Sequence, residues 1–122
     1  MLESYDRPSR FLSWACDTFT SEVAMDPAER LMRFVEEAVE LALACDMPRE
    51  TVDKIVARVY GRGPGNIEQE IAQCHVTLEM LAKVLKVDLE WAATREFERV
   101  QTIPKEEWDR RHSAKVAIGI AR

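Results

Sequence analysis

The hydrophobic pattern of residues 30–45 (RLMRFVEEAVELALAC) predicts a helix with apolar side chains on most of its faces. At about 100° per residue, most of these apolar residues form one broad stripe, and the others extend it round a second side. Charge is confined to a narrow arc of Arg33, Glu37 and Glu40, with Glu36 at its edge. A helix this apolar is normally buried, so we expect the carboxylates to face a cleft or an interface.

Helix-start signals divide the rest of the chain. Asp26 is an N-cap residue before Pro27, with Glu29 at the reciprocal position of a capping box. Asn66 and Asp88 are further N-caps. The patterns predict helices over residues 9–19, 27–45, 48–60, 67–86 and 89–100, after an irregular lead-in at 1–8 and before a last charged segment that opens at Pro104. The C-terminal segment KVAIGIAR (residues 115–122) is apolar enough to pack against another part of the protein, either as a helix or as an extended segment.

Composition favours an all-α fold in one domain. The chain has 122 residues, of which 47% are hydrophobic, and only four glycines and five prolines. These values fit one compact domain over 1–122, with a core at about 9–100 and a C-terminal extension at about 101–122. The number of predicted helices indicates a four- to five-helix bundle.

Charge and cysteine content limit the partners and the compartment. The net charge of −5 leaves no basic footprint for nucleic acid. Three cysteines without CxxC spacing are typical of buried free thiols in a reducing compartment. We find no signal-peptide pattern and no apolar stretch near the ~20 residues of a membrane span. We therefore expect a cytoplasmic protein that binds neither membrane nor nucleic acid.

Four oxygen-bearing side chains lie at helical spacing on two helices. Glu37 and Glu40 are neighbours on one face of the first helix, and Glu70 and Gln73 are neighbours on a later helix. Glu70 is the first residue of a row at three- and four-residue spacing that is otherwise neutral or apolar. A positive group should therefore compensate the charge of its carboxylate. If the two helices pack antiparallel, the pairs can face each other and offer the oxygen ligands that Mg²⁺ or Mn²⁺ requires.

Other interpretations of these residues stay open. Arg33 precedes Glu37 by four positions, so the glutamates could form a solvated ion-paired stripe. A di-iron bundle would need Glu-x-x-His pairs, and His75 lies five residues after Glu70. His75 is better read as a core or interface histidine, and His112 as a surface one.

Two residues could contact a planar or anionic ligand, although each has a structural alternative. Trp14 could stack on a base, but a tryptophan at helical spacing usually belongs to the core. Arg62 lies in the loop GRGPG and could reach a phosphate, or could be an ordinary solvated loop arginine. The loop lacks the GK[ST] of a phosphate-binding P-loop.

The segments ERLMRFVEEAVELALAC and EQEIAQCHVTLEMLAKVLKVDLEWA resemble the MazG-like all-α nucleoside triphosphate pyrophosphohydrolases. That family carries EExxE on one helix and ExxD on a later one. Glu36, Glu37 and Glu40 match the first motif, and Glu70 matches the first position of the second. The resemblance covers roughly residues 28–92.

The chain departs from the family pattern in three places. Gln73 stands where the family has Asp, so this position brings a carbonyl oxygen without charge. The segment between the motifs, residues 41–69, is somewhat long. The family's lysine, asparagine and arginine run after the last bundle helix is not recognisable here, so no substrate contact is transferred from it.

The resemblance implies that the helical bundle is of the all-α nucleoside triphosphate pyrophosphatase type and forms a homodimer or homotetramer. It implies an enzyme that hydrolyses a nucleoside triphosphate to the monophosphate and pyrophosphate with Mg²⁺, or with Mn²⁺ in its place. It implies Glu37, Glu40, Glu70 and Gln73 as metal ligands and Glu36 as the group that positions or deprotonates water. Trp14, Arg33 and Arg62 are candidates for substrate contacts. The alternatives are a MazG-like module that binds a nucleotide or a partner without turnover, because Gln73 weakens the metal site, and a plain helical oligomerisation module.

Overall fold

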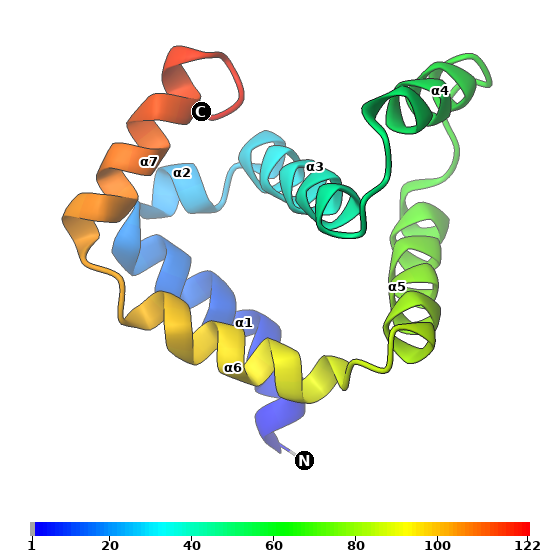
Figure 1. The fold of residues 1–122 in the computed structure, drawn as a ribbon. Helices are drawn as coiled ribbons and strands as arrows, with labels where there is room; N and C mark the ends of the chain where they lie inside the picture. The colour runs from blue at the N-terminus through cyan, green and yellow to red at the C-terminus, as the bar shows by residue number, and fades with distance from the viewer. Residues whose placement is uncertain (1) are drawn as a thin grey trace. The chain divides into compact units, whose positions relative to one another are not determined.

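The computed structural model describes the backbone of residues 2–122 and the side chains of residues 6–122. The described backbone is helical without strands, which confirms the all-α class (Figure 1). In order, the helices are α1 (Leu2–Thr18), α2 (Ser21–Ala24), α3 (Pro27–Ala44), α4 (Arg49–Tyr60), α5 (Ile67–Val84), α6 (Leu89–Gln101) and α7 (Lys105–Ala117). Along this part of the chain, every helix is too short or too polar to cross a membrane.

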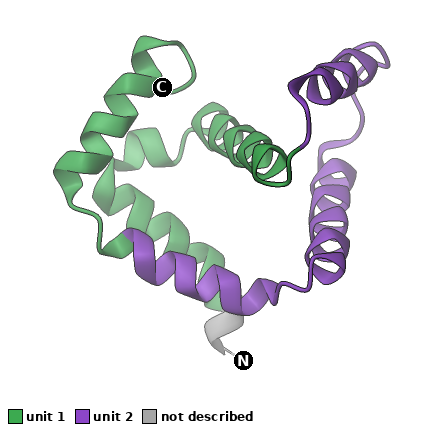
Figure 2. Cartoon of the chain, viewed as in Figure 1, with its two compact units in different colours: residues 1–46, 101–122 green, residues 47–100 purple. Residues whose placement is uncertain are grey.

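The chain divides into two compact units, each described here by itself (Figure 2). Unit 1 comprises residues 1–46 and 101–122, and therefore holds α1, α2, α3 and α7. Unit 2 comprises residues 47–100, with α4, α5 and nearly all of α6. The single domain expected over 1–122 stays a prediction.

Capping side chains set the helix starts as the sequence predicts. Asp26 accepts a hydrogen bond from the backbone N–H of Ala28 at 2.9 Å, and Pro27 follows it at the first helical position. In unit 2, Asn66 accepts from Gln69 N at 3.0 Å, and Asp88 accepts from Trp91 N at 3.0 Å. Each cap satisfies a backbone donor that the first helical turn leaves without a partner.

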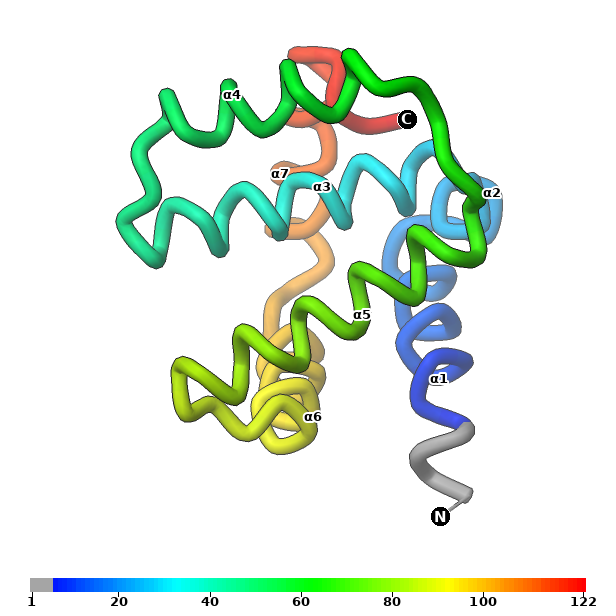
Figure 3. The backbone as a smooth tube through the Cα atoms, turned by 90° about the vertical axis from the view of Figure 1, so that its right-hand side faces the viewer, coloured from blue at the N-terminus to red at the C-terminus, as the bar shows by residue number. Residues whose placement is uncertain are grey.

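Two helix boundaries differ from the prediction. The lead-in expected at residues 1–8 is helical from Leu2, and Pro8 lies inside α1. A proline inside a helix keeps a helical φ angle, but it removes one backbone hydrogen bond and crowds the carbonyl four residues earlier, so Pro8 weakens α1 without ending it. The short helix α2 was not predicted; Thr20 caps it by accepting from Val23 N at 3.1 Å, and it leads into α3 (Figure 3).

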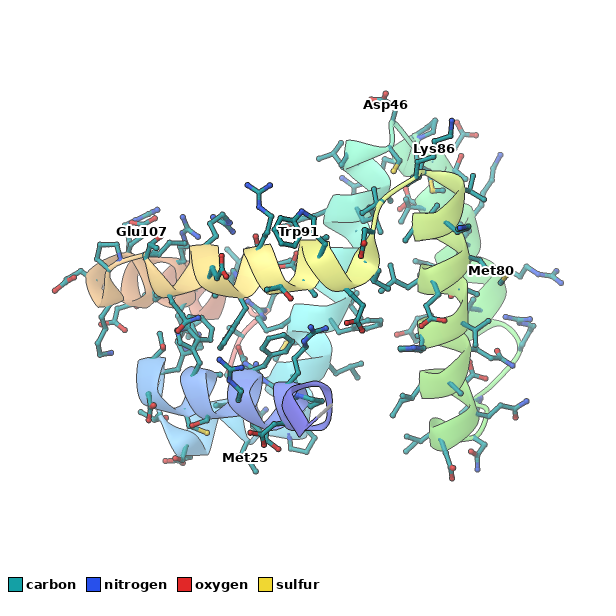
Figure 4. The ribbon with its side chains drawn as sticks, turned by 90° about the horizontal axis from the view of Figure 1, so that it is seen from below. Met25, Asp46, Met80, Lys86, Trp91 and Glu107 are labelled. Atoms are coloured by element: carbon teal, nitrogen blue, oxygen red, sulfur yellow. The ribbon has the colours of Figure 1, made fainter. Side chains whose placement is uncertain are left out.

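The helix ends of α3 and α5 use left-handed backbone. Asp46 has a φ of 61° and Lys86 a φ of 60°, and each directly follows the C-cap residue of its helix (Figure 4). Lys86 N donates to Lys83 O, and Val87 N donates to Ala82 O, so the last turn of α5 is closed by backbone bonds.

In unit 1, an aromatic cluster joins α7 to the end of α1. The Trp108 ring lies edge-on to Trp14 and Phe19, with centroid distances of 5.4 and 5.9 Å. Phe19 also contacts the His112 ring at 5.5 Å, and Lys105 Nζ donates to Thr18 O at 3.0 Å. Edge-to-face contacts of this kind add stabilisation beyond the area they bury.

The apolar faces of α3, α4 and α5 are largely exposed, and for α3 this contradicts the expected burial. Leu31 and Leu43 of α3 are 62% and 74% exposed, and Ile67 of α5 is 79% exposed. The buried hydrophobic residues along 6–122 are small: Ala15, Ala24 and Ala82. Glu29, in the first turn of α3, is the buried charged residue of this part of the chain, at 1% exposure.

Candidate functional site

The three motif glutamates of unit 1 lie on α3, about three to four turns after its N-cap. Helical spacing makes Glu40 a neighbour of both Glu36 and Glu37. Their environments differ. The Glu36 side chain is only 19% exposed and has two cationic partners, whereas Glu37 and Glu40 are exposed at the residue level. The three carboxylates therefore differ: the charge of Glu36 is compensated by cations, whereas Glu37 and Glu40 form a pair.

Glu37 and Glu40 form an electrostatically coupled pair. The pKa of Glu37 is raised, first because its carboxyl is partly desolvated, and then because of the like charge of Glu40 and a hydrogen bond with it. The charge of Glu36 acts in the same direction, and Lys115 acts against it. Two carboxylates held this close repel each other unless a proton or a cation lies between them.

Glu36 is neutralised by two cations from different parts of unit 1. Its Oε1 lies 2.8 Å from Lys115 Nζ of α7, and its Oε2 lies 3.6 Å from Arg33 Nη1, one turn earlier on α3. Lys115 was not among the predicted site residues. The only signal in the sequence was that its segment, KVAIGIAR, is apolar enough to pack.

A buried carboxylate near the start of α3 holds the C-terminal tail. Glu29 is 1% exposed, and its Oε2 accepts a hydrogen bond from the backbone N–H of Arg122 at 2.7 Å. Its Oε1 lies 3.6 Å from Arg33 Nε. The capping box expected at Glu29 is therefore wrong, because Asp26 N donates to Val23 O and Glu29 turns to the tail.

The tail makes further contacts with α3 and α7. Gly119 has a φ of 79°, a conformation natural to glycine, and turns the chain back from the end of α7. Arg33 Nη2 then donates to Ile120 O, and His112 Nε2 donates to Arg122 O at 2.9 Å. Because of these contacts the His112 side chain is only 21% exposed, so its assignment to the surface is wrong.

The second predicted pair lies in unit 2. Glu70 and Gln73 are both exposed on α5, so the compensated, buried position expected for Glu70 is not found. The Glu70 carboxylate instead folds over the backbone of Gly65. A Cβ at Gly65 would lie 2.6 Å from Glu70 Oε1, so the absence of a side chain there makes this position possible. His75, expected in a core or an interface, is exposed and lies 2.8 Å from Glu79.

The residues suggested for substrate contacts have distinct surroundings. Trp14 packs in the aromatic cluster with Phe19 and Trp108. Arg33 lies near the carboxylates of Glu29 and Glu36 and donates a hydrogen bond to Ile120 O. Arg62 is exposed on the loop between α4 and α5. The contacts of Trp14 and Arg33 are those of structural residues, and Arg62 is open to a ligand.

The structure brings Glu36, Glu37 and Glu40 together in unit 1, and places Glu70 and Gln73 one turn apart in unit 2. Because each unit is described by itself, the convergence of the two pairs stays a prediction. Among the described residues, no group of three or more His, Cys, Asp or Glu has a metal-binding arrangement. The chain matches no family model, no curated protein and no solved structure.

Replacing Glu29 with Gln should destabilise unit 1. Glutamine can still accept from Arg122 N, but the half-buried Arg33 loses a charged partner, so we expect the free energy of unfolding to fall by about 2 kcal/mol. Urea unfolding followed by circular dichroism measures this. Glu50→Gln, which removes an exposed pair with Lys54, is the matched control and should cost less than about 0.5 kcal/mol. Equal losses in the two variants would mean that Glu29 is not a stabilising centre.

Proposed function

We propose that this protein is a metal-dependent nucleoside triphosphate pyrophosphohydrolase that converts a (d)NTP and water to the (d)NMP and pyrophosphate, and that it serves to clear nucleotides. The observation that carries the proposal is the coupled pair Glu37–Glu40, with the raised pKa of Glu37. This pair occupies the second and last positions of the EExxE motif, where the MazG-like resemblance puts metal ligands.

The chemistry of the pair fits a divalent cation. A cation between the Glu37 and Glu40 carboxylates would relieve their repulsion. Mg²⁺ and Mn²⁺ prefer oxygen ligands of this kind. From the resemblance we propose Glu70 as a third ligand and Gln73 as a weaker, uncharged one. Gln73 lowers the negative charge of the ligand set, so metal affinity should be modest.

In the proposed reaction, the bond that breaks is the anhydride between the α- and β-phosphates, and water supplies the oxygen. A bound divalent metal supplies charge neutralisation of the phosphate oxygens. Glu36 has both carboxylate oxygens fixed by Lys115 and Arg33, which gives it a defined orientation. We propose that it orients the water or accepts its proton. Arg62 is the proposed phosphate contact, since its side chain is open.

The neutral side chain of Gln73 favours one alternative function, a module that binds a nucleotide without hydrolysing it. If the amide lowers the metal affinity below what hydrolysis needs, the protein binds the nucleotide and does not turn it over. Nucleotide-dependent thermal stabilisation without pyrophosphate release would identify such a binding module.

We also propose that the protein is a homodimer or homotetramer. The support is the exposure of large apolar side chains on α4 and α5, such as Tyr60 at 85%, Val84 at 76% and Met80 at 57%. Helices of this length gain most of their stability from packing an apolar face. A second copy of the chain offers the same faces and so can cover them.

Pyrophosphate release tests the activity. Incubation with a panel of canonical and modified (d)NTPs and Mg²⁺ or Mn²⁺ should release pyrophosphate. Glu37→Gln and Glu70→Gln should each lower the rate by at least about 100-fold, because each removes a charged metal ligand. Glu50→Gln is the control of equal charge and should leave the rate unchanged. Absence of release with every nucleotide and both metals would rule out the enzyme.

Gly65→Ala tests Glu70 without altering it. The new Cβ would displace the Glu70 carboxylate, and because the end of a glutamate side chain moves easily, stability should change by less than about 1 kcal/mol. If Glu70 binds metal from the observed position, Mn²⁺ affinity measured by titration should fall by about threefold or more. The same substitution in the Glu70→Gln background should have no further effect. A fall that persists in that background would mean that Gly65 acts independently of Glu70.

Light scattering during size-exclusion chromatography tests the oligomer. The wild-type protein should have at least twice the mass of one chain. Met80→Lys should raise the monomer fraction, because it places a charge in an apolar contact. Glu68→Lys, on an exposed polar position of the same helix, is the control. A monomeric wild-type protein at micromolar concentration would contradict the proposal.

A further inference from the structure

Lys115 is a lysine of α7 whose ammonium group faces the carboxylate arc of α3. Its Nζ lies 2.8 Å from Glu36 Oε1, and its side chain is only 28% exposed. Arg33 approaches the other oxygen of Glu36. Glu36 therefore has one cation at each oxygen, one from its own helix and one from the last turn of α7.

Lys115 is fixed in this position by its own backbone and by the tail that follows. Its carbonyl accepts from Ile120 N at 3.0 Å, which closes the turn at Gly119. The tail beyond this turn is bound to Arg33, His112 and Glu29. A lysine whose main chain is anchored in this way loses less freedom on pairing than a mobile surface lysine does.

We propose that Lys115 is a positioning residue: with Arg33 it occupies the carboxylate of Glu36, so that Glu37 and Glu40, and not all three glutamates of the motif, are available to a divalent cation. This inference rests on the proposed metal site. It assigns a role to the C-terminal segment, which lies outside the stretch that resembles the MazG-like family.

Mn²⁺ binding to the full-length protein, followed by electron paramagnetic resonance of the free ion, tests the proposal. Glu36→Gln should leave the dissociation constant within about twofold of wild type, because Glu36 is not a ligand. Lys115→Met releases the Glu36 carboxylate and should tighten Mn²⁺ binding by about tenfold, as expected for one added charged ligand. Lys115→Arg keeps the charge and should retain the wild-type value.

The double variant separates positioning from general electrostatics. In the Glu36→Gln background, Lys115→Met should tighten Mn²⁺ binding by no more than about twofold, since only a screened charge is lost. Lys54→Met, in an exposed pair of unit 2, controls for the change in net charge. Thermal unfolding of each variant shows whether it is folded, and Glu36→Gln and Lys115→Arg keep the test valid if Lys115→Met does not fold.

Each outcome decides between named explanations. Equal tightening by Lys115→Met in both backgrounds, or none in either, overturns the positioning role. Weakening by Glu36→Gln as strong as that by Glu37→Gln makes Glu36 a ligand and also overturns it. Wild-type protein that does not bind Mn²⁺, or binds it equally well after Glu37→Gln, removes the metal site itself, and the inference about Lys115 with it.

Discussion

The hydrogen bond from Arg122 N to the buried Glu29 carboxylate is the contact on which the arrangement of unit 1 depends. A carboxylate that is almost completely buried needs strong partners, and Glu29 has a backbone donor and Arg33. This contact holds the chain after Gly119 against α3. It thereby fixes the end of α7, from which Lys115 reaches Glu36. The geometry at the motif glutamates thus depends on a residue that the motif does not include.

The consequence is that three glutamates of one motif have different electrostatic roles. Glu36 is compensated by Lys115 and Arg33, whereas Glu37 and Glu40 repel each other. Repulsion between carboxylates is a cost that a cation can offset, and the metal site proposed on α3 rests on this.

The sequence was sufficient to predict the class of the fold and the main helices, because caps and breakers act locally. Asp26, Asn66 and Asp88 cap the helices they were expected to cap. Contacts between segments far apart in sequence were not predictable in this way. The partner of Glu29 is 93 residues away, and capping-box spacing suggested a local partner instead.

The candidate site was predictable to a similar degree. Helical spacing made Glu37 and Glu40 neighbours, and their coupling agrees with it. The neutralisation of Glu36 depends on Lys115 of α7, and no periodicity relates these two residues. The contact of Glu70 with Gly65 depends on how the loop enters α5, which spacing alone does not define.

Binding of Mn²⁺ to the wild-type protein and to Glu37→Gln tests the central claim most directly. If Glu37 and Glu40 together hold the cation, wild-type protein binds Mn²⁺ in the absence of nucleotide. The Glu37→Gln variant should then bind at least about tenfold more weakly, because it loses a charged ligand. Equal binding by the two proteins would contradict a metal site on α3.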